Sequence, residues 1–306
     1  MCIWGAIGNT PLVELENLGD KPAAVRIFAK LEGNNPGGSV KDRAAYWMIK
    51  AAEESGELTP DRIILEATSG NTGIALAMIG AARGYRVTLC MAASVSVERR
   101  RVLEALGAEV ILTPAHERTD GAIVRARRLM EQFPDRYFLP NQFGNENNIL
   151  AHYATTGPEI YAQTQGEVDV FVTGMGTTGT LMGVSRYLKQ QKPQARIVGI
   201  EPPLGHHIQG LKNMQESMKP KIYDPRQLDE TITVCDADAY ETARQLAKRE
   251  GIFAGMSSGA SAAGALYLAR RMKRGTIVAL LPDRGDRYLS TGLFQSAAIE
   301  STARVA

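Results

Sequence analysis

One stretch decides the fold of this chain: Asn35-Pro36-Gly37-Gly38-Ser39-Val40-Lys41-Asp42-Arg43. Its proline and glycines mark a turn. Ser39 followed three residues later by Asp42 is typical of a capping box at the start of a helix. Apolar residues then continue at helical spacing over 44–52. The pattern therefore predicts a helix that carries Lys41 in its first turn.

This position has chemical consequences for Lys41. The first turn of a helix carries about half a positive charge, so an ammonium there is disfavoured and its pKa is expected to be lowered. A partly desolvated lysine that loses its proton easily is what Schiff-base chemistry needs. The alternative is a lysine that extends into solvent and has no chemical role. Other parts of the sequence have to show whether Lys41 is a Schiff-base lysine or a solvent-exposed one.

Composition argues against several classes of function. The chain has 306 residues, of which 44% are hydrophobic and 22% are charged, as in a globular protein of about two domains. The 35 basic and 33 acidic residues nearly balance, which gives no support for a nucleic-acid-binding surface. No apolar run approaches the length of a membrane span.

The N-terminus and the cysteines favour the cytoplasm. Residues 1–5 show no basic segment before a long apolar core, so they do not resemble a secretory signal. Cys2, Cys90 and Cys235 are too few and too scattered for a disulfide framework. We expect a cytoplasmic protein that binds neither membranes nor nucleic acids.

Apolar strand-like runs alternate with helix-like segments along most of the chain. Strands are expected at 12–15, 25–30, 63–65, 87–91, 110–112, 168–173, 196–200, 231–235 and 277–281. Solidly apolar strands in such an alternation predict mostly parallel sheets with helices on both faces and ligands beyond the carboxyl ends of the strands. The polar stretch 141–148 separates two series, which indicates an α/β protein of two doubly wound domains. Residues 202–229 show no clear period and are expected to be irregular.

A glycine- and threonine-rich loop joins a predicted strand to a predicted helix: Gly174-Met175-Gly176-Thr177-Thr178-Gly179-Thr180. Glycines allow close approach of the backbone, and amides at a helix start point toward an anion. The threonine hydroxyls suit a terminal phosphate. Two alternatives stay open: a tight turn, or a dinucleotide site, because the glycine spacing matches that fingerprint and Glu201 ends the next strand.

A second loop is rich in donors but carries no charge: Thr68-Ser69-Gly70-Asn71-Thr72-Gly73. Its hydroxyls and amides could hold a carboxylate, although an elaborate helix cap would use the same residues. Together the two loops and the first-turn lysine predict one site. The glycine-threonine loop would bind a phosphate, the second loop an amino-acid carboxylate, and Lys41 would supply an amine between them.

The remaining candidates are less specific. Ser257 precedes the last long helix and would be a neutral partner for a pyridine nitrogen, if such a ring lies nearby. Asp283 and Asp286 are interpreted as a solvated turn with internal salt bridges rather than as paired acids. The four histidines lie apart or, at 206–207, lack a third ligand, so no metal site is expected.

The chain resembles the cysteine synthase family, pyridoxal-phosphate enzymes of fold type II with a tryptophan synthase β-like architecture. The resemblance extends almost end to end. It rests on residues 30–36 and on Ile7-Gly8-Asn9-Thr10-Pro11-Leu12, Gly38-Ser39-Val40-Lys41-Asp42-Arg43, Thr68-Ser69-Gly70-Asn71-Thr72-Gly73, Gly176-Thr177-Thr178-Gly179-Thr180 and Asp286-Arg287-Tyr288-Leu289-Ser290-Thr291-Gly292. It implies a smaller N-terminal α/β domain over 36–145 that binds the substrate carboxylate. Residues 1–35 and 146–306 would form a larger domain that binds the cofactor phosphate.

The resemblance also implies roles for single residues. Lys41 would be the catalytic residue and would attach pyridoxal 5'-phosphate through a Schiff base. Asn71 would bind the ring hydroxyl of the cofactor and Ser257 its ring nitrogen. The cofactor phosphate would be bound by Gly176, Thr177, Thr178, Gly179 and Thr180, and the substrate carboxylate by Thr68, Ser69, Thr72 and Gln142.

Within the family, the Gly-Thr-Thr-Gly-Thr loop and Asp283-Arg284-Gly285-Asp286 resemble the B-type O-acetylserine sulfhydrylases. This likeness implies cysteine biosynthesis by a homodimer. Sulfide or thiosulfate would replace the acetate of O-acetyl-L-serine, giving L-cysteine or S-sulfocysteine. The alternatives within the family are an O-phosphoserine sulfhydrylase and a cystathionine β-synthase-like enzyme, and the remote alternative is an NAD-dependent dehydrogenase.

One segment departs from the B-type pattern: Ile208-Gln209-Gly210-Leu211-Lys212-Asn213 stands where B-type relatives carry arginines. A single lysine cannot hold an oxyanion as a guanidinium fork does, so the preferred sulfur donor stays open. The preferred leaving group and the binding of a serine acetyltransferase stay open as well. The end of the chain at Ala306 is expected to leave no room for a regulatory domain.

Overall fold

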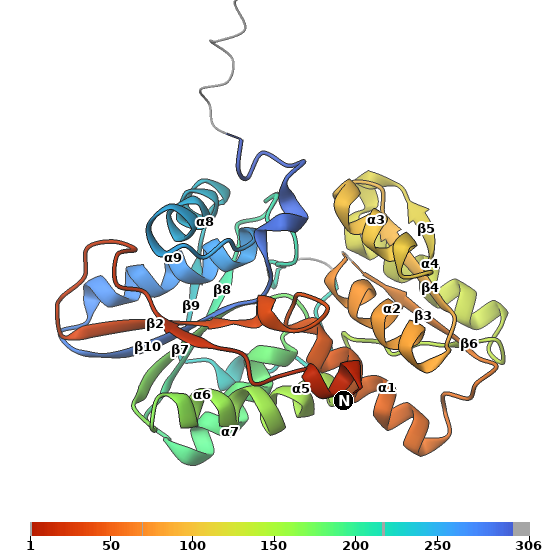
Figure 1. The fold of residues 1–306 in the computed structure, drawn as a ribbon, viewed down its shortest axis with the longest axis horizontal. Coiled ribbons are helices and arrows are strands. Elements are labelled where there is room, and N and C mark those ends of the chain that lie inside the picture. The colour runs from red at the N-terminus through yellow and green to blue at the C-terminus, as the bar shows by residue number, and fades with distance from the viewer. Residues whose placement is uncertain (1, 69, 216–217, 296–306) are drawn as a thin grey trace, which may run out of the picture.

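The computed structural model describes residues 2–68, 70–215 and 218–295. Strands and helices alternate in two groups, each built around its own sheet (Figure 1). Within the described residues, no helix is long and apolar enough to cross a membrane.

The larger sheet has six strands in the order β1-β2-β10-β7-β8-β9. They are β1 (Leu12–Glu14), β2 (Val25–Leu31), β7 (Val168–Gly174), β8 (Arg196–Glu201), β9 (Glu230–Thr233) and β10 (Gly275–Leu281). All neighbours pair in parallel except β1 and β2. One face is covered by α8 (Asp236–Glu250) and α9 (Met256–Arg271), and the other by α5 (Glu146–Ala151), α6 (Gly157–Gln163) and α7 (Gly179–Gln191) (Figure 1).

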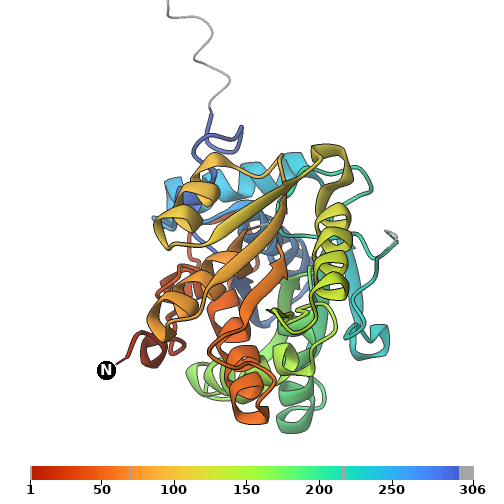
Figure 2. The same cartoon turned by 90° about the vertical axis from the view of Figure 1, so that its right-hand side faces the viewer.

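The smaller sheet has the order β5-β4-β3-β6, and all of its strands are parallel. They are β3 (Ile63–Ala67), β4 (Val87–Ala92), β5 (Glu109–Thr113) and β6 (Tyr137–Phe138). Figure 2 shows this part facing the viewer. One face packs on α1 (Lys41–Ser55), α2 (Asn71–Arg83) and α3 (Val97–Ala105), and the other on α4 (Arg118–Gln132). Every residue of β3 and β4 is buried, as their mostly apolar sequences predict, and this includes the polar Glu66 and Thr88.

The structure confirms the predicted α/β architecture of two mostly parallel sheets. Gly56 and Gly84 end α1 and α2 in left-handed conformations, with φ of +77° and +79°, where a glycine costs least. The described part of 202–229 is irregular apart from a short 3-10 turn at Pro225–Gln227, as expected. The two-residue strand β6 was not predicted, because it is too short to show a period. The domain limits at 36–145 stay a prediction.

Candidate active site

Most of the predicted site residues line one cavity between the two sheets. They are Lys41, Asn71, Thr72, Gln142, Gly176, Thr177, Thr178, Thr180 and Ser257. Thr68 lines an adjoining groove, and Gly179 is buried at the start of α7. Ser69 lies outside the described residues. The cavity lies beyond the carboxyl ends of β3 and β7, where parallel sheets usually bind ligands.

Lys41 is the first residue of α1 and faces this cavity. Burial lowers the pKa of its amine to about 8, against the pull of the nearby Asp283 and Glu32 carboxylates. The predicted direction is confirmed, but the main cause is desolvation rather than the helix end. No hydrogen bond or ion pair joins the Lys41 amine to any residue that the structure describes.

The predicted capping box is wrong. The helix is capped by Val40, which already has helical backbone angles and provides no side-chain cap. Ser39 Oγ accepts a hydrogen bond from the Lys41 amide at 3.3 Å, whereas Asp42 turns back to the Gly37 amide at 2.5 Å. The Asp42 carboxylate therefore accepts a hydrogen bond from the preceding turn instead of capping the helix. Burial raises the pKa of Asp42 to about 7.

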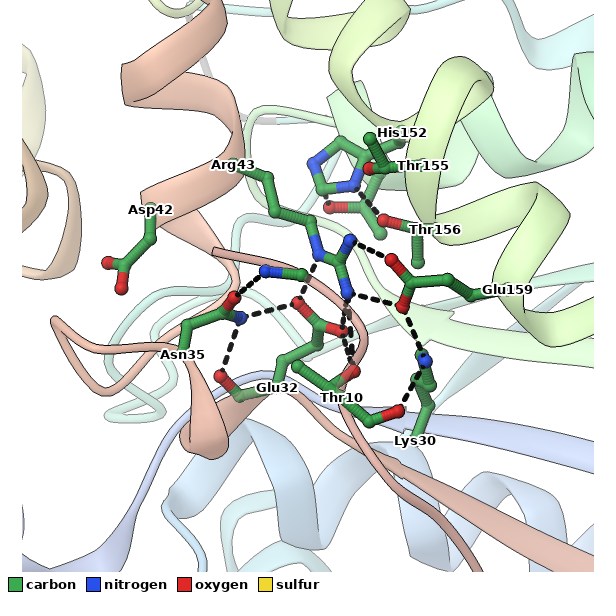
Figure 3. A network of polar contacts seen from close by, with 12 residues as sticks. Thr10, Lys30, Glu32, Asn35, Asp42, Arg43, His152, Thr155, Thr156 and Glu159 are labelled. Atoms are coloured by element: carbon green, nitrogen blue, oxygen red, sulfur yellow. Dashed lines mark hydrogen bonds and ion pairs between the residues drawn. The ribbon is translucent and has the colours of Figure 1, made fainter. Parts of the chain in front are cut away.

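Two residues after Lys41, Arg43 belongs to a buried cluster of four charged side chains (Figure 3). The Arg43 guanidinium donates to Glu32 at 2.8 Å and to Glu159 at 2.6 and 2.7 Å. Lys30 donates to Glu159 at 2.6 Å and to the Thr10 carbonyl at 2.7 Å. Two cations and two anions balance, and the cluster joins α1 to β2 and α6 of the larger sheet. Sequence patterns gave no sign of it.

The glycine-threonine loop presents free amides to the cavity. Thr178 adopts φ +68°, and α7 begins at the next residue. Among the described residues, none accepts a hydrogen bond from the amides of Gly176, Thr177 or Thr178. A Cβ at Gly176 would lie 2.6 Å from the Gly210 carbonyl oxygen, so this position requires glycine. A loop of this kind at a helix start suits an anion.

His152 supports this loop, a role that the sequence did not indicate. Its Nδ1 lies 2.9 Å from Thr156 Oγ1 (Figure 3), and its Nε2 lies 3.2 Å from Thr180 Oγ1. Burial holds the pKa of the imidazole well below its usual range, so the ring is neutral. Among the described residues there is no group of three metal-ligating side chains.

The second predicted loop holds Thr72 and Gln142 together. Thr72 Oγ1 donates to Gln142 Oε1 at 2.7 Å, and Gln142 Nε2 donates to the Ala67 carbonyl at 2.8 Å. Thr68 Oγ1 accepts from the amides of Gly70 and Gly73 at 2.9 and 3.3 Å, which is a capping role. The expectation of a donor-rich strand-to-helix loop is confirmed. One hydrogen on Gln142 Nε2 stays available.

Ser257 completes the cavity on the side of the larger sheet. It is the second residue of α9 and is buried. Within the described part of the chain, its hydroxyl has no hydrogen-bond partner. The cavity therefore contains three sets of polar groups that have no partner in the part of the chain that the structure describes: the Lys41 amine, the Ser257 hydroxyl and the amides of 176–178.

The interpretation of Asp283 as solvated is wrong. Its side chain is fully buried and accepts hydrogen bonds from Asn71 at 2.7 Å and from the Tyr288 hydroxyl at 2.6 Å. Asp286 is exposed and pairs with Arg284 at 3.2 Å, as predicted. Two of the residues that enclose Asp283, Asn71 and Arg99, come from distant parts of the chain, so the local sequence could not distinguish the two aspartates.

Comparison with known proteins identifies the family. A family model described as "Pyridoxal-phosphate dependent enzyme" matches residues 3–283. The chain belongs to this family. The cysteine synthase B of Salmonella typhimurium is 50% identical to this pyridoxal-phosphate enzyme, and the alignment covers 94% of each chain. A cysteine synthase of Aquifex aeolicus is 46% identical, with 94% of this chain and 90% of the relative covered.

Solved structures agree with this family. A cysteine synthase from Entamoeba histolytica has a TM-score of 0.89 at 41% identity, covering 95% of this chain and 90% of that one. An O-acetylserine dependent cystathionine beta-synthase from Helicobacter pylori has a TM-score of 0.91 at 36% identity, covering 96% and 99%. The predicted fold type and cofactor are thereby confirmed. The cavity of this pyridoxal-phosphate enzyme fits the cofactor, since its three sets of unpartnered groups match an aldehyde, a ring nitrogen and a phosphate.

Proposed function

We propose that this enzyme is a cysteine synthase of the B type. It replaces the acetate of O-acetyl-L-serine by sulfide or thiosulfate and forms L-cysteine or S-sulfocysteine. The observation that carries the proposal is a desolvated Lys41 amine that pairs with none of the described residues, in a chain 50% identical to a cysteine synthase B. Its location between an anion-binding loop and a donor-rich loop supports an amino-acid substrate.

In this proposal, different residues around the cavity bind different parts of the cofactor. Lys41 attaches it covalently, Asn71 binds its ring oxygen and Ser257 its ring nitrogen. The loop Gly176–Thr180 holds its phosphate through backbone amides at the start of α7. When bound, pyridoxal phosphate supplies an electron sink for the negative charge that develops at the α-carbon of the substrate.

Lys41 also moves the proton. When it is not joined to the cofactor, the Lys41 amine can take the α-proton of the bound substrate and later return a proton to the product. A pKa of about 8 leaves a useful fraction of the amine uncharged near neutral pH. The substrate carboxylate lies against Thr68, Ser69, Thr72 and Gln142. Gln142 Nε2 and the first amides of α2 are the donors that can face it.

Ser257 is a neutral partner for the ring nitrogen. We infer that it limits carbanion lifetime and so favours replacement over transamination, because a carboxylate there would strengthen the electron sink. Ser257→Asp should therefore raise half-transamination, measured as formation of pyridoxamine phosphate. An unchanged rate would contradict this role.

The proposal is tested by rapid-mixing spectra of the holoenzyme with O-acetylserine, O-phosphoserine and serine in turn. O-acetylserine should change the visible band fastest, and cysteine should form after sulfide is added. A fastest response to O-phosphoserine or serine would favour the alternative activities within the family.

The dehydrogenase alternative lacks support, since Glu201 accepts a hydrogen bond from the Met214 amide at 3.1 Å and holds a loop. Colourless purified protein that binds NAD would revive it.

Several further properties belong to the same proposal. The smaller domain at 36–145 closes over the substrate carboxylate, which the cavity between the two sheets supports. Identical small-angle scattering with and without bound amino acid would contradict a large closure.

A homodimer follows the family resemblance and is testable by analytical ultracentrifugation. Free Cys2, Cys90 and Cys235 support a cytoplasmic location, testable by cell fractionation.

A further inference from the structure

The segment after β10 contains a buried polar group that the proposed mechanism does not use. Asp283 contacts Asn71, which lines the cavity, but Asp283 is not itself among the described residues that line it. Its side chain is fully buried, and its Oδ1 has no hydrogen-bond partner among the described residues. A buried carboxylate is costly unless other groups compensate its charge.

Two charged residues contact opposite ends of the Asn71 amide. Asn71 Nδ2 donates to Asp283 Oδ2 at 2.7 Å, and Arg287 Nη1 donates to Asn71 Oδ1 at 2.5 Å. An ionised carboxylate only accepts hydrogen bonds, and a guanidinium only donates them. The amide can therefore satisfy both partners in one orientation only, with its nitrogen toward Asp283.

This orientation decides what Asn71 offers to the cavity. The amide nitrogen has two hydrogens, and one of them is used by Asp283. The second hydrogen is left for a ligand. With the amide reversed, its oxygen would face the Asp283 carboxylate and its nitrogen the Arg287 guanidinium, so both contacts would be repulsive. The two charged side chains thus make Asn71 a hydrogen-bond donor.

Both charged residues are themselves held in place. The Tyr288 hydroxyl donates to the same Asp283 oxygen at 2.6 Å, and Arg99 forms an ion pair with it at 3.5 Å. Arg287 also donates to the Gly37 carbonyl, in the turn that precedes Lys41. The pair therefore connects Asn71 with the start of the lysine helix, and Asn71 has little freedom to turn.

We propose that Asp283 and Arg287 are positioning residues, which fix the Asn71 amide so that its nitrogen donates to the ring oxygen of the bound cofactor. This rests on the proposed function, in which Asn71 binds that oxygen. Asp283 and Arg287 act through Asn71 and do not touch the cofactor themselves.

The test is a double-mutant cycle on the full-length holoenzyme. Asp283→Asn replaces an acceptor by a group that can also donate, so the Asn71 amide loses its fixed direction. The cofactor should bind about tenfold more weakly, the scale of one hydrogen bond to a charged group. The visible band and its circular dichroism should also shift. Asp286→Asn, in the exposed pair of the same loop, should change neither.

The second arm places the same substitution in Asn71→Ala. There most of the effect of Asp283→Asn on cofactor affinity and circular dichroism should disappear, because the amide it orients is gone and only the loss of a carboxylate near Lys41 is left. Full additivity of the two substitutions would overturn the proposal. So would an unchanged spectrum and affinity in Asp283→Asn, or in Asn71→Ala.

A third variant tests the proposal if Asp283→Asn fails to fold. Arg287→Gln removes the strict donor from the other end of the amide and should give the same losses, again absent in Asn71→Ala. If these losses persist there, the proposal fails. The outcomes also separate it from the proposed function. Wild-type enzyme without a visible band or cysteine formation would contradict the proposed function, whereas an active wild type with additive variants contradicts only the positioning role.

Discussion

The two walls of the cavity are held in different ways. The wall that carries Lys41 is fixed by the buried cluster of Arg43, Glu32, Glu159 and Lys30, which ties α1 to the larger sheet. At the contact between Thr72 and Gln142, by contrast, the wall is held by side-chain hydrogen bonds between neutral groups. Buried ion pairs tolerate little displacement, because a separated charge stays desolvated. Neutral hydrogen bonds can rearrange at lower cost, which suits a wall that adjusts to substrate.

The largest effect should come from Lys41→Ala. Loss of the covalent amine and of the proton carrier should abolish the visible band and lower kcat by at least about a thousandfold. Lys50→Ala, on the exposed face of the same helix, is the control and should retain both. Absorbance and steady-state cysteine formation are the measurements, and a coloured, active Lys41→Ala enzyme would disprove the assignment.

Arg43→Met should be the next most severe change. It leaves Glu32 and Glu159 buried without their main counter-ion, which should cost about 3–5 kcal/mol of unfolding free energy. Urea unfolding measures this, with Arg26→Met at the exposed Arg26–Glu14 pair as a control that should leave the midpoint nearly unchanged. A loss no greater than that of the control would mean that the cluster does not anchor α1.

Thr72→Val tests the part of the cavity wall that is held by neutral hydrogen bonds, at the contact between Thr72 and Gln142. Removing the hydroxyl that holds Gln142 should raise KM for O-acetylserine about tenfold, with little change in stability or in the visible band. Thr233→Val on the exposed strand β9 is the matched control. If Thr72→Val instead unfolded the protein as readily as Arg43→Met, the contrast between the two walls would be lost.

The pH dependence of Lys41 sharpens the same contrast. Only the neutral amine attacks an aldehyde, and burial lowers its pKa to about 8. The rate at which the cofactor-free enzyme acquires its visible band should therefore rise about tenfold per pH unit below 8 and level off above it. An ordinary lysine would show a rise that continues toward pH 10, and such a profile would contradict a desolvated amine.

The smallest effect concerns the sulfur donor. Lys212 lines the cavity and pairs with Asp120 at 3.2 Å, so part of its charge is already compensated. Lys212→Arg should raise kcat/KM for thiosulfate relative to sulfide about threefold, because a guanidinium binds oxyanions through two parallel hydrogen bonds. Lys189→Arg, at a half-buried position of α7 where the lysine pairs with Asp229, should leave the ratio unchanged. A fall in the ratio would exclude Lys212 from donor recognition.

The sequence predicted features whose causes are local. Lys41 was placed in a first turn because glycine and proline mark the preceding turn, and apolar residues mark the helix. The two donor-rich loops were found because each follows a mostly apolar strand. Features that depend on distant partners were missed or wrong. Asp283 is buried by residues from α2 and α3, and Asp42 is drawn to Gly37 instead of capping the helix.

The role of His152 also could not be predicted from the local sequence. Its partners Thr156 and Thr180 come from its own irregular helical segment and from α7, and only folding brings the latter close. A lone histidine in a helical pattern is also compatible with many roles. No local signal distinguishes support of an anion-binding loop from simple burial.

The first three residues of α1 have separate tasks within a single turn. Lys41 faces the cavity, Asp42 the preceding loop and Arg43 the charged cluster. Successive residues of a helix are rotated by about 100°. Deleting or inserting one residue here would redirect all three side chains at once, so this segment should tolerate changes of side-chain type far better than changes of length.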